Sequence, residues 1–249
     1  MITDADDDRL DPYRSLRGRP ADEGTFVIEG LTTLRQAMAA GVSLRSALVL
    51  SHRADDVADL EVPVHLVDRH AMTAITGYDV HRGVLALADR PPARTVDDVV
   101  REARVVVAME GLTDAENVGA VFRNAAAFGA EAVVLDPTCS DPLLRRTVRV
   151  SVGNVLHVPW ARATTWPLAL DGVPVLALTP SGEDDVTALV EPPERYVLLV
   201  GAEGDGLSDA ALASADRRLR IPMAPGVDSL NVATAAAVAL SHLRRTGAS

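Results

Sequence analysis

Three loop-like segments of the 249-residue chain, 110–130, 201–210 and 221–240, follow apolar runs and carry side chains that could do chemistry. They supply a guanidinium, a carboxylate, two amides and a hydroxyl, from Arg123, Glu203, Asn117, Asn231 and Ser229. The segments hold no histidine or cysteine nucleophile, and the chain has no G-x-S-x-G elbow. The six histidines lack metal-ligand spacing, so we expect no metal.

Each segment alone also has a purely structural interpretation. Asn117, Ser229 or Asn231 at a helix start could be an N-cap, worth about 1 kcal/mol. The glycines around Glu203 could form a tight turn, with Ser208 capping the next helix. Arg123 is harder to explain in this way. It lies among apolar neighbours, where a charge needs a partner, a phosphate or an opening to solvent.

The hydrophobic pattern places these segments at strand ends. Five continuous apolar runs predict strands at 105–109, 132–136, 173–179, 195–201 and 218–222. Helices are predicted around 118–128, 141–150, 208–213 and 231–245. Apolar runs that alternate with helices indicate an α/β fold with a parallel sheet covered on both faces. Ligands bind beyond the carboxyl ends of such strands, so we expect the three segments to converge.

The rest of the chain suggests a smaller α/β domain. Residues 25–89 alternate short strands and helices, with glycine stops at Gly41 and Gly77. Residues 1–24 are polar and predict a flexible arm, residues 90–104 predict a linker that becomes helical, and 105–249 form the larger domain.

The net charge of −11 argues against a protein that binds nucleic acid through bulk charge. All 24 basic residues are arginine, which suits bidentate phosphate contact, although a GC-rich genome would produce the same bias. The single cysteine, Cys139, excludes an intramolecular disulfide and fits a reducing cytoplasm. The acidic start is unlike a secretory signal, and no apolar stretch reaches the roughly 20 residues that span a membrane, so we expect neither export nor a membrane partner.

Together the three segments resemble the signature motifs of the SpoU/TrmH-like branch of the SPOUT methyltransferases. The first is N-x-G-x-x-x-R at Asn117–Arg123, the second is G-x-E-G-x-G-L-S at Gly201–Ser208, and the third is I-P-M at Ile221–Met223 with S-L-N-V-A at Ser229–Ala233. The resemblance is strong over 105–245 and weaker over 25–89, which is similar to the family's N-terminal substrate-binding domain. The first motif departs from D-P-x-N, because Ala115 replaces the proline.

The resemblance implies an RNA 2′-O-ribose methyltransferase with a deep trefoil knot, working as a homodimer. It implies S-adenosylmethionine as cofactor, held near Thr179, Gly201, Ile221, Met223 and Leu230. It implies Arg123 as the activator of the ribose hydroxyl, with Asn117, Glu203, Ser229 and Asn231 orienting the reactants. Ribosomal RNA is favoured over transfer RNA because of the extra N-terminal domain.

Two groups of arginines are candidate RNA contacts. They are Arg14, Arg17 and Arg19, and Arg145, Arg146 and Arg149, although the first group could lie in a solvated tail and the second on a solvated helix face. Two other classes of protein compete with the methyltransferase. A nucleotide-binding oxidoreductase would need G-x-G-x-x-G after the first strand, which is absent. A non-catalytic RNA-binding module on the same fold is disfavoured by the intact polar set.

Overall fold

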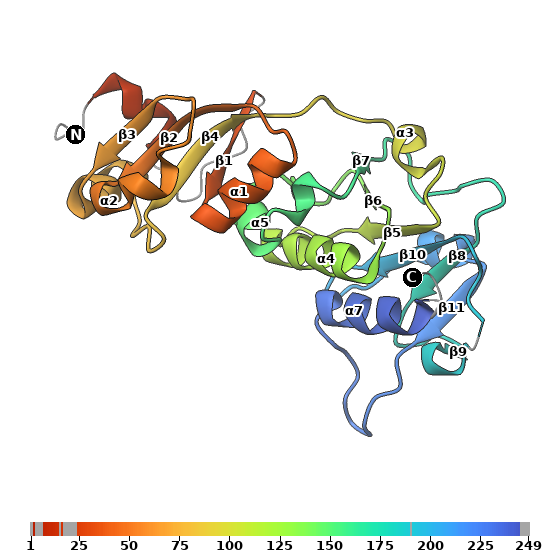
Figure 1. Cartoon of the computed structure of the whole chain (residues 1–249). Coiled ribbons are helices and arrows are strands. Elements are labelled where there is room, and N and C mark those ends of the chain that lie inside the picture. The colour runs from red at the N-terminus through yellow and green to blue at the C-terminus, as the bar shows by residue number, and fades with distance from the viewer. Residues whose placement is uncertain (1, 3–6, 15, 17–23, 190, 245–249) are drawn as a thin grey trace. The chain divides into compact units, whose positions relative to one another are not determined.

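The computed structural model describes residues 2, 7–14, 16, 24–189 and 191–244. The chain divides into two compact units, one of residues 1–92 with 143–156 and one of residues 93–142 with 157–249 (Figure 1). We expected segment 143–156 inside a continuous domain over 105–249. It packs instead with the N-terminal residues, so the chain passes three times between the units.

The first unit is built on a four-stranded sheet in the described part of the chain, in the order β1-β4-β2-β3. Its strands are β1 (Thr25–Glu29), β4 (Val84–Asp89), β2 (Leu44–Leu50) and β3 (Val64–Val67). The β1–β4 and β4–β2 pairs are antiparallel, and β2–β3 is parallel. Its helices are α1 (Leu31–Ala39), α2 (Arg69–Thr76), α5 (Arg145–Val150) and the 3-10 helices η1 (Asp8–Tyr13), η2 (Ser51–Val57) and η3 (Asn154–Leu156). As predicted, α2 ends at Gly77 in the left-handed region, with φ 77°.

The N-terminal segment differs from the flexible arm predicted over 1–24. Leu10 and Tyr13 of η1 are fully buried and join the apolar core that α2 forms against the sheet. The Tyr13 hydroxyl lies 2.8 Å from Ser46 Oγ on β2. Two apolar side chains spaced three apart on one helix face drive this packing. Arg17 and Arg19 lie outside the described residues.

The second unit contains a seven-stranded parallel sheet in the described part of the chain, in the order β7-β6-β5-β10-β8-β11-β9. The strands are β7 (Trp160–Arg162), β6 (Ala132–Leu135), β5 (Val105–Glu110), β10 (Tyr196–Gly201), β8 (Val175–Leu178), β11 (Arg217–Arg220) and β9 (Asp184–Asp185). The five strands predicted from apolar runs are all present. Strands β7 and β9 were not predicted, because they are too short to produce a hydrophobic pattern.

Helices cover both faces of this sheet. They are α3 (Val96–Val100), α4 (Ala115–Phe128), α6 (Asp209–Ser214), α7 (Val232–Leu243) and the 3-10 helix η4 (Val186–Ala188). Val99 and Ala211, from α3 and α6, share one apolar core with alternate residues of the central strands. Helices α4 and α7 pack side by side (Figure 1). The predicted linker over 90–104 does become helical at α3, which begins with a capping box between Thr95 and Asp98.

The strand order shows the mixed α/β class with a parallel sheet that the sequence predicts. The trefoil knot implied by the family resemblance stays a prediction, because sheet order alone does not establish how the chain is threaded. Within the described residues, no helix combines the length and the apolar character needed to cross a bilayer.

Candidate active site

One asparagine joins the three predicted loops. Asn231, the N-cap of α7, donates from Nδ2 to Asn117 Oδ1 at 2.8 Å and to Glu203 Oε1 at 2.5 Å. Its Oδ1 accepts from the backbone N–H groups of Ala233 and Thr234, which fixes the amide's orientation. Asn231 is therefore both a helix cap and the centre of a polar junction, whereas the sequence presented these as alternatives.

Asn117 is not the cap of its own helix. Asp114 is the N-cap of α4, and its side chain accepts from Glu116 N at 2.7 Å. Asn117 is the third helical residue, so its amide is available to Asn231. Ala115 occupies the first helical position, where the family's proline fits without losing a hydrogen bond. Helix α4 therefore begins at Ala115 without the proline, with Asp114 as its cap.

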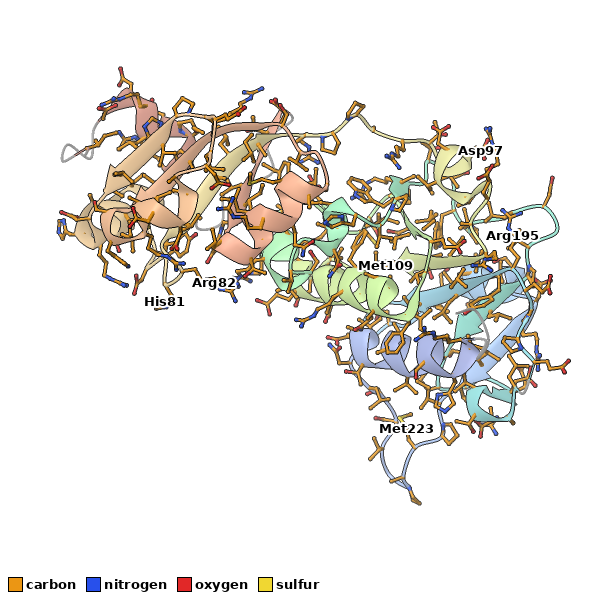
Figure 2. All side chains as sticks on the ribbon, in the orientation of Figure 1. His81, Arg82, Asp97, Met109, Arg195 and Met223 are labelled. Atoms are coloured by element: carbon orange, nitrogen blue, oxygen red, sulfur yellow. The ribbon has the colours of Figure 1, made fainter. Side chains whose placement is uncertain are left out.

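A cavity of about 630 Å³ lies beside this junction. Its lining includes all five residues predicted to hold the cofactor: Thr179, Gly201, Ile221, Met223 and Leu230. Glu203, Ser229 and Asn231 also line it. Figure 2 shows Met223 on the long loop between β11 and α7. The volume is typical of small-molecule sites, and the mixture of aliphatic side chains, backbone and the two carboxylates of Glu203 and Asp205 suits an amphipathic ligand.

The glycine-rich loop folds back on itself. Ala202 and Gly206 form an antiparallel bridge, and Gly204 and Gly206 have φ values of 91° and 71°. A Cβ on Gly201 would lie 2.5 Å from the carbonyl carbon of Gly206. Gly201 has no room for a side chain, because the loop itself fills that space.

Two buried acids, which were not predicted from the sequence, accept hydrogen bonds at the carboxyl ends of β5 and β6. Glu110 ends β5 and accepts hydrogen bonds from Ser208 and Trp166. Asp136 follows β6 and accepts from the backbone N–H groups of Gly111, Thr138 and Cys139. The sequence signal that could have identified these two residues is an acid at the end of each apolar run. These contacts order the loops that lead to Asn117 and Glu203.

Cys139 packs between the same loops. Its thiol accepts from Leu112 N at 3.3 Å and donates to the Met109 carbonyl at 3.4 Å. Burial raises the pKa of the thiol to about 12. Cys139 is therefore a structural residue of the second unit.

Arg123 is exposed on α4, with no hydrogen bond or ion pair to any residue that the structure describes. The sequence left three explanations for Arg123: a partner, a phosphate or an opening to solvent. The structure supports the opening to solvent. Arg123 lies about 9 Å beyond Asn117 along the helix axis and is not among the cavity-lining residues. The next residue, Asn124, escaped the sequence analysis. Its amide donates to the Ala233 carbonyl at 2.7 Å and ties α4 to the first turn of α7.

The candidate RNA contacts have different environments. Arg145 forms an ion pair with Glu29, stacks 4.3 Å from the centre of the Tyr78 ring and is largely buried. Arg149 lies 4.0 Å from Glu29 and is 37% exposed, and Arg146 is exposed. Arg14 bonds to Asp11 at 2.7 Å. The charges of Arg145 and Arg14 are thus already compensated within the first unit.

The donor set fits an organic cofactor. Within the described residues, no cluster of three or more His, Cys, Asp and Glu side chains could hold a metal ion. The cavity offers apolar walls for a base, and hydroxyl, amide and carboxylate groups for a charged amino-acid moiety. These are the features that S-adenosylmethionine requires.

A parallel sheet with polar loops meeting beside such a cavity fits the class of RNA methyltransferases that use S-adenosylmethionine. Residues 104–241 match the model of the SpoU rRNA methylase family, and residues 13–102 match that of the thiostrepton-resistance methylase N terminus. The chain belongs to the SpoU rRNA methylase family, and S-adenosylmethionine is its cofactor.

Relatives agree over nearly the whole chain. An uncharacterised tRNA/rRNA methyltransferase of Mycobacterium tuberculosis is 41% identical, over 99% of this chain and 92% of its own. An rRNA methyltransferase from Sinorhizobium meliloti, solved with S-adenosylmethionine bound, has 27% identity and a TM-score of 0.82, covering 100% of this chain and 98% of its own. A structure described as an RNA 2′-O ribose methyltransferase has 27% identity and a TM-score of 0.77, covering 97% of each chain.

Proposed function

We propose that this enzyme methylates a ribose 2′-hydroxyl of structured RNA, with ribosomal RNA as the favoured substrate. The observation that carries the proposal is the junction in which Asn231 bonds Asn117 and Glu203 beside the cofactor cavity. Similarity to a 2′-O ribose methyltransferase and to an rRNA methyltransferase supports the choice of acceptor. Relatives named tRNA/rRNA methyltransferases keep transfer RNA as the alternative substrate.

The proposed chemistry assigns a role to each polar residue. When bound, the cofactor supplies the methyl group. The ribose hydroxyl must lie in line with that group and pass its proton to the neighbouring RNA phosphate or to solvent as the new bond forms. Positioning alone contributes several kcal/mol. A guanidinium is too basic to serve as a general base, so Arg123 acts through its charge, on the developing alkoxide or on the neighbouring phosphate. Asn117, Glu203, Ser229 and Asn231 orient the ribose and the amino-acid end of the cofactor.

RNA also needs a binding surface outside this site. Arg146 and Arg149 remain our candidates, because Arg146 is exposed and Arg149 has only a weak contact with Glu29. Arg145 has a structural role instead, since it compensates the buried Glu29. The homodimer remains a prediction from the family resemblance, to be tested by light scattering of the purified protein.

The decisive experiment uses the alkali resistance of 2′-O-methylated RNA. Ribosomal and transfer RNA from cells that lack this gene are incubated with the enzyme and methyl-labelled cofactor, then hydrolysed in alkali. A methyl group on ribose blocks cleavage at that position, so the label is recovered in dinucleotides. Label in mononucleotides would show base methylation and refute the ribose assignment.

The variant Arg123→Ala tests the role of the guanidinium in the same assay. We expect it to abolish label transfer while calorimetry shows unchanged cofactor affinity, because Arg123 does not line the cavity. Near-normal turnover by this variant would exclude the role. An inactive wild-type enzyme that still binds both cofactor and RNA would instead favour the non-catalytic alternative.

A further inference from the structure

Glu110 is a buried acid at the carboxyl end of a central strand, and its side chain is not among those that line the cofactor cavity. It is 9% exposed. Its Oε1 accepts from Ser208 Oγ at 2.7 Å and from Trp166 Nε1 at 2.8 Å, and its Oε2 accepts from Ser208 N at 2.9 Å. Three donors therefore converge on one carboxylate, and both partner residues come from other segments of the second unit.

These contacts hold the end of the glycine-rich loop. Glu110 faces Gly201 across the β5–β10 ladder, where the loop begins, and its carboxylate binds Ser208, where the loop ends. The residues between them, Ala202 to Leu207, all line the cavity. Both ends of this cavity wall are thus attached to the same residue, by the ladder at one end and by the carboxylate at the other.

The chemistry of the side chain matters as much as its shape. Trp166 Nε1, Ser208 N and, in this arrangement, Ser208 Oγ are donors. A carboxylate accepts from all three, whereas an amide of equal size must turn its NH2 group toward at least one of them. A buried donor that faces another donor loses its hydrogen bond and pays its desolvation cost. The site therefore requires a side chain with two acceptor oxygens rather than any polar side chain.

We infer that Glu110 is a positioning residue for cofactor binding: it fixes the 202–207 loop, and thereby Glu203, in the geometry that receives S-adenosylmethionine. The carboxylate acts through Ser208 and does not need to touch the cofactor. This inference concerns cofactor affinity alone, so it can fail or succeed independently of which RNA atom is methylated.

The test compares two acids at opposite ends of the parallel strands, Glu110 at the carboxyl ends and Asp216 at the amino ends. Asp216 accepts from Val175 N at 2.7 Å, at the amino end of β8 and so away from the strand ends that form the cavity. We expect Glu110→Gln to raise the Kd for S-adenosylmethionine about tenfold, equivalent to ~1.4 kcal/mol. We expect the control, Asp216→Asn, to lower the melting temperature and leave the Kd unchanged. Both are measured by calorimetry where the variants are folded.

Equal affinity in Glu110→Gln and wild type, with only the melting temperature lowered, would overturn the inference. If Glu110→Gln does not fold, Ser208→Asp replaces it. That variant keeps an N-cap for α6 but sets a second carboxylate against Glu110. Weakened cofactor binding would support the positioning role, and wild-type affinity would show that Ser208 serves only as a cap.

Trp166 provides a readout that a purely structural role would not change. The chain has two tryptophans, so Trp160→Phe leaves Trp166 as the only indole emitter. Because Glu110 connects Trp166 to the loop, S-adenosylmethionine should shift the emission of this variant. The additional change Glu110→Gln should abolish the shift even at saturating cofactor. An identical shift with and without the carboxylate would contradict the connection.

Discussion

Replacing Asn231 by aspartate would separate the helix cap from the polar junction. The native Oδ1 accepts from Ala233 N and Thr234 N, and a carboxylate preserves this cap. The native Nδ2 donates to Asn117 and Glu203, and a carboxylate cannot. The amide of Asn117 can rotate to become the donor. Glu203 has no such option, so two carboxylates would face each other where a 2.5 Å hydrogen bond exists now.

The expected energies follow from this geometry. Two like charges about 4 Å apart repel by ~1 kcal/mol in water and ~4 kcal/mol at an effective dielectric constant of 20, and this exposed site lies near the lower value. A negative charge at the start of α7 gains about 0.3–1 kcal/mol from the helix dipole. Asn231→Asp should therefore change the free energy of unfolding by less than ~1 kcal/mol. Asn231→Ala, which loses the cap and both donor bonds, should lose about 2 kcal/mol.

The assay combines urea unfolding with calorimetry of S-adenosylmethionine binding. We expect Asn231→Asp to be folded but to bind the cofactor weakly, because Glu203 is pushed away from its position beside the cavity. Adding Glu203→Gln restores a donor opposite the new carboxylate. A double-mutant cycle should then give a favourable coupling of about 1 kcal/mol between positions 231 and 203.

Additive effects in that cycle would refute the reasoning, since they would mean that the two side chains do not interact in solution. Wild-type cofactor affinity in Asn231→Asp alone would refute it as well. A loss of stability as large as that of Asn231→Ala would show that the cap, rather than the junction, determines the behaviour of this residue.

Four other measurements test the structure. Gly201→Ala should cost about 1–3 kcal/mol in urea unfolding and weaken cofactor binding, because its Cβ would overlap the Gly206 backbone; unchanged stability would contradict the loop packing. Cys139 should resist thiol reagents at pH 8 until the protein unfolds, because burial raises its pKa to about 12, and rapid labelling would argue against that burial. Arg145→Ala should lose about 3 kcal/mol, because the buried Glu29 would lose its close ion-pair partner and keep only Arg149 at 4.0 Å and the Tyr78 hydroxyl at 3.3 Å. Arg149→Gln should instead lower the slope of RNA affinity against salt by about 1, at unchanged stability.

Local sequence patterns predict the second unit well. Continuous apolar runs such as 105–109 and 195–201 identify its central strands, because a parallel sheet covered by helices leaves no exposed face. Parallel strands bring their carboxyl ends to one edge, which places the polar loops together. The five cofactor contacts implied by family resemblance all line one cavity. Hydrophobic periodicity alone would have located the carboxyl ends of the strands as a ligand site, but it would not have identified the ligand.

Contacts between distant residues were beyond local patterns. Glu110 and Ser208 are 98 positions apart, and Glu29 and Arg145 are 116 apart. Nothing in hydrophobic periodicity distinguishes a buried acid with three donors from an exposed one. The placement of 143–156 in the first unit has the same cause. Its short α5 packs on β1, and Arg145 pairs with Glu29 there, which no local pattern predicts.

The arrangement of charges reconciles an acidic protein with an RNA substrate. Many of its arginines are paired with nearby carboxylates, as in Arg35–Asp59, Arg45–Asp89, Arg69–Asp79, Arg104–Glu131 and Arg217–Asp184. Exposed pairs of this kind add at most ~1 kcal/mol each to stability, but they cancel the charge that a phosphate would meet. Arg123 has no such partner among the described residues, and it shares α4 with Asn117. RNA should therefore be attracted to specific unpaired guanidinium groups rather than to the surface as a whole. Removing one of these groups should then lower RNA affinity by more than the net charge of −11 suggests.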